Sequence, residues 1–96
     1  MSNKKGTEKE LSCLVYPGMF KSERAVEITL PDGRTVSAFV DERDVRASSQ
    51  PTLAGTVAGS VKVSVVEDKG ESVIVDLPQP TLTNGTRFEV RKAELK

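Results

Sequence analysis

The chain has 96 residues with 14 basic and 14 acidic side chains, one cysteine and no histidine. A chain of this length forms one domain with a modest core. Its formal net charge of zero gives no global field to attract nucleic acid or anionic lipid, so an electrostatic partner must meet a local patch. A single cysteine without histidine excludes an intramolecular disulfide and the usual zinc sites.

The chain divides into a polar leading segment, residues 1–10, and a domain spanning residues 11–96. The leading segment is polar and has no apolar run that could offset the entropy cost of ordering, so we expect a disordered arm. No apolar run approaches the roughly 20 residues that span a bilayer. These features predict a cytoplasmic protein with no membrane partner, and the unpaired Cys13 agrees with a reducing compartment.

Period-2 alternation predicts strands in the first part of the domain. Residues 26–30 and 34–40 alternate apolar and polar side chains, and Pro31-Asp32-Gly33 between them suits a type I turn with a G1 bulge, which together predict a hairpin. Residues 11–16 form a further strand candidate with apolar side chains on both faces. The apolar side chains expected on one face of the return strand are Val36, Ala38 and Val40.

The second part of the domain shows the same alternation. Residues 57–65 carry the longest alternating run, and residues 72–77 follow a turn-forming stretch, which predicts a second hairpin. Residues 86–91 form the last predicted strand, and 92–95 a short turn. Gly59 interrupts the longest run and suggests a bend or bulge there.

The fold class predicted from these elements is all-β: about five to six short antiparallel strands with little or no helix. A small barrel is favoured over a sandwich because a short chain gains by closing its edges. The order of elements resembles that of SH3-like barrels, and an OB-type Greek-key barrel would satisfy nearly the same pattern. Both likenesses concern the fold alone, because one such fold hosts many functions.

The chain also contains a weak internal echo. Residues 11–16 resemble 61–66, and residues 40–45 resemble 90–95 in apolar and acidic spacing, at one shared offset. This spacing suggests two three-strand halves related by duplication. Alternating strands match one another easily, however, so chance resemblance is the favoured interpretation.

No constellation of catalytic or cofactor-binding residues stands out. Without histidine there is no conventional base to activate a serine, and Asp41-Glu42-Arg43-Asp44 lacks the glycine and distal glutamate of an EF-hand loop. The two glycines of residues 55–60 miss both the P-loop and the dinucleotide spacing. We therefore predict a protein that is not an enzyme and that has no cofactor and no metal.

The most suggestive segment for binding runs from residue 16 to 24. Aromatic and methionine side chains on a loop with nearby cations suit adaptable recognition, though Met19 and Phe20 would equally serve to plug one end of the barrel. The predicted binding residues here are Tyr16, Met19, Phe20, Lys21 and Arg24.

The outward face of the last strand adds Arg87 and Arg91, which an intervening Glu89 dilutes, so an ordinary solvated face competes with a phosphate-tracking stripe. Together these features predict a non-catalytic small β-barrel binding module that takes part in protein–protein interaction or assembly. The alternative is a nucleic-acid-binding barrel, in which a few aromatics stack on bases and the lysines and arginines meet phosphates.

Overall fold

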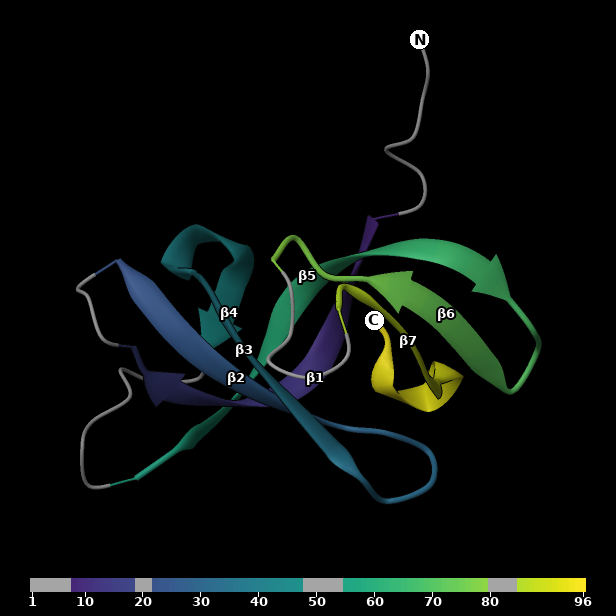
Figure 1. The fold of residues 1–96 in the computed structure, drawn as a ribbon, viewed down its shortest axis with the longest axis horizontal. Helices are drawn as coiled ribbons and strands as arrows, with labels where there is room; N and C mark the ends of the chain where they lie inside the picture. The colour runs from purple at the N-terminus through teal and green to yellow at the C-terminus, as the bar shows by residue number, and fades with distance from the viewer. Residues whose placement is uncertain (1–7, 19–21, 48–54, 80–84) are drawn as a thin grey trace, which may run out of the picture.

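A computed structural model describes residues 8–18, 22–47, 55–79 and 85–96 (Figure 1). Within these ranges the regular elements are strands and two short 3-10 turns, which confirms the all-β prediction. No helix in the described ranges is long and apolar enough to cross a membrane. The elements in chain order are β1 (Glu8–Pro17), β2 (Glu23–Thr29), β3 (Thr35–Asp41), η2 (Glu42–Asp44), β4 (Val45–Ala47), β5 (Val57–Asp68), β6 (Ser72–Asp76), β7 (Arg87–Arg91) and η3 (Lys92–Glu94).

Each of the six predicted strands exists, with ends that differ by up to three residues. β1 begins at Glu8 rather than Leu11, because Glu8, Lys9 and Glu10 pair with β5 as the first three residues of a long ladder. Residues 1–7 of the predicted arm lie outside the described residues. β4 is an additional strand that was not predicted, because three residues are too few to show a clear alternation.

The strands form one antiparallel sheet in the order β3-β2-β1-β5-β6-β7, with β4 added to β5. The sheet is strongly curled, so that both hairpins fold over the central strands (Figure 1). Inward side chains alternate with outward ones along β1, β2 and β3 and in the middle of β5, and the inward set merges into a single core. The largest fully buried members are Leu11, Ile28, Val15, Val26, Val40, Val61, Val63, Val73, Val75 and Val90. Whether the curled sheet is nearer to an SH3-like or an OB-type barrel stays a prediction.

The first predicted turn forms as expected. The Leu30 amide donates to the Arg34 carbonyl at 2.7 Å and the Gly33 amide donates to the Leu30 carbonyl at 2.9 Å. Gly33 has φ of 91°, the left-handed conformation that a G1 bulge requires of its glycine. The hairpin therefore follows from residues adjacent in the sequence.

The sheet consists of two halves with the same strand pattern. The first half runs β1-β2-β3-η2-β4, and the second runs β5-β6-β7-η3 and ends with Leu95 (Figure 1). In the first half Val45 pairs with Val61 of β5, and in the second Leu95 pairs with Leu11 of β1. Each member of the second pair lies 50 residues from its counterpart in the first. Each half thus pairs its last segment, β4 in the first half and Leu95 in the second, with the first strand of the other half.

Hydrogen bonds outside the ladders repeat in the same way. The Glu42 amide donates to the Ser22 carbonyl at 2.8 Å, and the Lys92 amide donates to the Glu71 carbonyl at 2.9 Å. The hairpins also correspond, with β2 matching β6 at an offset of 49 and β3 matching β7 at 50. The echo in the sequence therefore coincides with a repeated strand pattern in the structure, and its origin by duplication stays a prediction.

Gly59 lies where β4 approaches β5 most closely. A Cβ atom at this position would collide with the Arg46 carbonyl oxygen and lie 2.9 Å from Cγ2 of Val15. The sequence predicted a bend or bulge at Gly59, whereas the structure shows that a side chain has no room there. The short β4 can therefore pair with β5 because Gly59 has no side chain.

We expect Gly59→Ala to lower the free energy of unfolding by about 1–3 kcal/mol, since backbone atoms must shift to admit the methyl group. Urea denaturation measures the loss. Gly55→Ala is the matched control, because a Cβ there meets open space, and its stability should stay within about 0.5 kcal/mol of the parent. Equal stability of the two variants would contradict the close approach of β4.

Candidate functional site

The outward face of β1, β2 and β3 carries an uncovered group of apolar side chains. Register pairs Tyr16 with Ala25 and Ala25 with Phe39, so these three form one row across the strands. Leu14 lies on the same face of β1, two residues before Tyr16. The Leu14 side chain is 42% exposed and that of Phe39 37% exposed. We call Leu14, Tyr16, Ala25 and Phe39 the apolar patch.

A polar contact holds one member of the apolar patch in place. The Tyr16 hydroxyl donates a hydrogen bond of 3.0 Å to Oε1 of Glu27, a neighbour on β2. Accepting this bond, the Glu27 carboxylate raises the pKa of Tyr16, with desolvation and the negative charge acting in the same direction. The phenol therefore stays protonated at neutral pH and presents its ring as part of the surface.

A shallow cavity of about 260 Å³ adjoins Leu14. Residues of β1 and β2 line this cavity together with Arg91 of β7, one of the predicted binding residues. The Arg91 guanidinium donates to the Pro31 carbonyl at 3.0 Å. Polar side chains dominate its lining, which includes Ser12, Glu27, Thr29, Arg91 and Glu94. The structure thus places Arg91 near the apolar patch, with its guanidinium bound to the β2–β3 turn.

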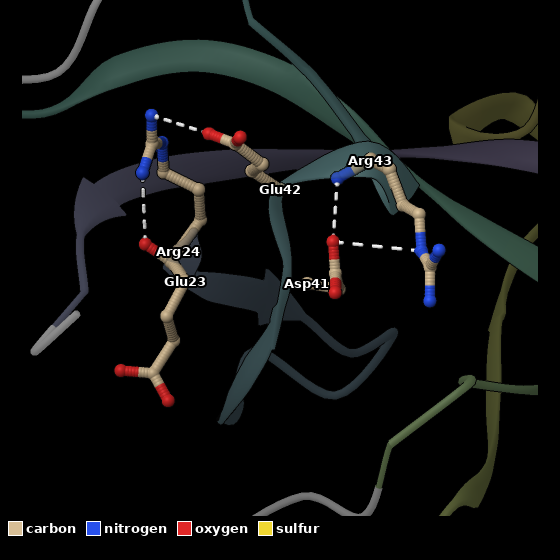
Figure 2. A network of polar contacts seen from close by, with 5 residues as sticks. All are labelled: Glu23, Arg24, Asp41, Glu42 and Arg43. Atoms are coloured by element: carbon tan, nitrogen blue, oxygen red, sulfur yellow. Dashed lines mark hydrogen bonds and ion pairs between the residues drawn. The ribbon is translucent and has the colours of Figure 1, made fainter. Parts of the chain in front are cut away.

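Arg24 turns away from the outer face. It occupies a core-facing position of β2, and its side chain is 14% exposed. Figure 2 shows its guanidinium between Glu42 and the backbone of Glu23. The guanidinium donates to Oε1 of Glu42 at 3.2 Å and to the Glu23 carbonyl at 2.9 Å. In the adjoining η2 turn, Asp41 accepts from the Arg43 amide at 3.0 Å, which uses part of the acidic cluster as a helix cap.

Arg87 lies on the outward face of β7, as predicted, and is held by an acidic neighbour. Its Nε and one terminal nitrogen each donate to Asp76 at 2.9 Å. This fork-like contact lowers the pKa of Asp76 below its usual value. Arg24 and Arg87 are therefore both engaged with carboxylates within the chain.

The remaining predicted residues, Met19, Phe20 and Lys21, lie outside the described residues, so their role stays a prediction. Sequence reasoning missed Leu14 and Phe39 as surface residues. The signal for Phe39 was present, because strand parity sets it with Thr35 and Ser37, opposite the buried Val36, Ala38 and Val40. An aromatic residue on an otherwise polar strand face is the feature that points to it.

The described residues hold no group of three or more Cys, Asp or Glu side chains placed to bind a metal ion. Cys13, the single thiol, points into the core from β1. Burial raises the pKa of Cys13 to about 12, so the thiolate that a nucleophile needs is scarce at neutral pH.

We expect Cys13 in the folded chain to react with a disulfide reagent at pH 8 at least about a hundredfold more slowly than a surface thiol, because both thiolate formation and access are suppressed. Ser64→Cys supplies an exposed thiol on β5 for comparison. Absorbance of the released thiol follows both reactions. Labelling of native Cys13 at the rate of the Ser64→Cys thiol would show that the site is open.

Comparison with known proteins supplies no relative from which a function can be transferred. No family model, no curated protein and no solved structure matches the chain. Its function has to be inferred from its own residues.

Proposed function

We propose that the chain is a non-catalytic binding module for a protein partner, and that the apolar patch on β1, β2 and β3 is its contact surface. The observation that carries this proposal is the exposure of Leu14 and Phe39 beside Tyr16 on one strand face. Large apolar and tyrosine side chains are enriched in protein interfaces, where a partner removes them from water.

The second half of the chain supports this proposal by contrast. Its outer face has Ser64 and Glu89 at the positions that correspond to Leu14 and Phe39. The register of β5 with β6 shifts between Val65 and Glu67, so Glu67, which pairs with Ile74, corresponds to Tyr16. Glu89 there accepts a hydrogen bond from Ser72 and lies 3.9 Å from the Lys69 ammonium. The corresponding face thus has polar side chains at the positions of Leu14 and Phe39, with Ile74 and the exposed Val66 as its apolar members. Large apolar side chains at positions 14 and 39 are therefore not required by the architecture.

The engagement of the cations favours protein over nucleic acid. Arg24 and Arg87 form ion pairs with Glu42 and Asp76, and Arg91 binds a backbone carbonyl. A phosphate backbone would have to displace these partners, and the net charge of zero adds no attraction at long range. A partner that lays apolar side chains on Leu14 and Phe39 displaces only water.

β3 adds a second means of contact. It ends the sheet on its side and, among the described residues, pairs only with β2. An extended segment of the partner could therefore hydrogen-bond along β3 while its side chains cover Phe39.

Crosslinking from two matched positions tests the proposal. p-Benzoylphenylalanine in place of Phe39 should crosslink a partner in cells of the source organism, and the same group in place of Glu89, the corresponding position in the second half, should not. The crosslinked protein is identified by mass spectrometry and purified for titration calorimetry. Equal crosslinking from both positions would exclude a specific surface around Phe39.

With that partner in hand, Leu14→Ser with Phe39→Ser should weaken binding at least about a hundredfold, as expected for central interface residues. The loss in stability should stay near 1 kcal/mol per residue, because both side chains are already part-exposed. Val66→Ser, which removes a 44% exposed side chain from the second half, is the control and should bind as the parent does. Unchanged affinity of the double variant would overturn the proposal.

A further inference from the structure

The repeat allows the same end of the two hairpins to be compared, where β2 and β6 begin and β3 and β7 finish. At the core-facing position nearest this end, the first half has Arg24, which pairs with Val40, and the second half has Val73, which pairs with Val90. Val40 and Val90 lie 50 residues apart and are both buried. Arg24 and Val73 are therefore equivalent positions that differ in length and charge.

In the first half the Arg24 side chain fills this end. With 14% exposure, its aliphatic stem lies largely out of solvent, and its guanidinium reaches Glu42 on the η2 turn and the Glu23 carbonyl (Figure 2). The side chain thus acts as a built-in occupant with an apolar stem and a charged tip.

In the second half, where the shorter Val73 stands at the position of Arg24, there is a cavity of about 380 Å³, large enough for a small ligand. Val65, Val73 and Leu95 form its apolar lining. Lys9 of β1, Lys92 of η3 and Lys96 lie around it together with Asp68. We call this cavity the lysine-rimmed pocket.

The charge at the equivalent of Glu42 is reversed. Lys92 occupies that position, 50 residues later, with the same backbone hydrogen bond to the preceding loop. Asp68 is already engaged, since it accepts from the Lys92 ammonium and from the Gly70 amide, each at 2.9 Å. Lys9 and Lys96 have no carboxylate partner in the described part of the chain. Among the charged side chains that line the pocket, three are lysines and one is an aspartate, so these side chains give it a surplus of positive charge.

We propose that the lysine-rimmed pocket binds an aliphatic carboxylate. The apolar stem of the ligand lies over Val65, Val73 and Leu95 as the Arg24 stem lies in the first half, and its carboxylate meets Lys9 and Lys96. The ligand thus repeats the role of Arg24 with the charge inverted. This site is formed by the second half together with Lys9 of β1 and does not depend on the apolar patch.

Two probes distinguish a free acid from an acidic side chain: hexanoate, and N-acetylglutamate N-methylamide. Backbone amide shifts of Val73, Leu95 and Lys96 should move and saturate with one of them or with both. Hexylammonium, with the same stem and the opposite charge, should leave these amides unmoved, and acetate, which lacks the stem, should bind far more weakly. Failure of both carboxylates, or equal shifts with hexylammonium, would overturn the proposal.

Two sets of variants then locate the site. Lys9→Gln with Lys96→Gln should weaken binding of the active probe at least about tenfold, the contribution of one charge-assisted hydrogen bond. Lys62→Gln, an exposed lysine outside the pocket lining, should not change it. Val73→Arg with Lys92→Glu rebuilds the first-half arrangement and should abolish binding while the chain remains folded by circular dichroism. Undiminished binding by the lysine pair variant, or by the folded rebuilt variant, would contradict the assignment.

Discussion

The antiparallel pairing of β1 with β5, centred on Leu11 and Val61, is the constraint on which the rest of this structure depends. Both side chains are fully buried, and each of these two residues also pairs, on its other edge, with the last strand of the opposite half. Val45 lies beside Val61 and Leu95 beside Leu11. Because each half completes the other's sheet, neither half can bury its core side chains alone, and the two hairpins close over a single core.

This arrangement separates the positions that the fold needs from those it leaves open. Apart from Arg24, whose counterpart is Val73, the inward positions of the paired hairpins carry apolar side chains at matching sites, as in Val15 and Val65 or Val40 and Val90. The outward positions do not match, because Phe39 is replaced by Glu89 at the equivalent position of the second half, and Leu14 is replaced by Ser64. Surface ion pairs such as Asp76 with Arg87 contribute little to stability, so the outer faces can diverge without loss of the fold.

The same reasoning applies at the open ends of the sheet. Arg24 closes one end with a side chain that the strand itself provides, and the pairing with Glu42 makes its partial burial tolerable. At the other end, beside Val73, lies the lysine-rimmed pocket, and its lysine side chains make its lining cationic. Two copies of one architecture thereby present two different surfaces, an apolar strand face and a cationic pocket.

Much of this could be read from the sequence, because alternation and turn chemistry are local. The inward sets of β2 and β3 follow from period 2, the hairpin between them from Pro31-Asp32-Gly33, and the outward place of Phe39 from parity alone. The tertiary structure decided three other features: the strand β4, the need for glycine at position 59, and the pairing of Val45 and Leu95 each with the opposite half. Each depends on residues tens of positions apart, whose approach no local pattern encodes. Arg24 shows the limit most directly: it reads as a loop cation in the sequence, and only the register of β2 against β3 places it at the mouth of the core.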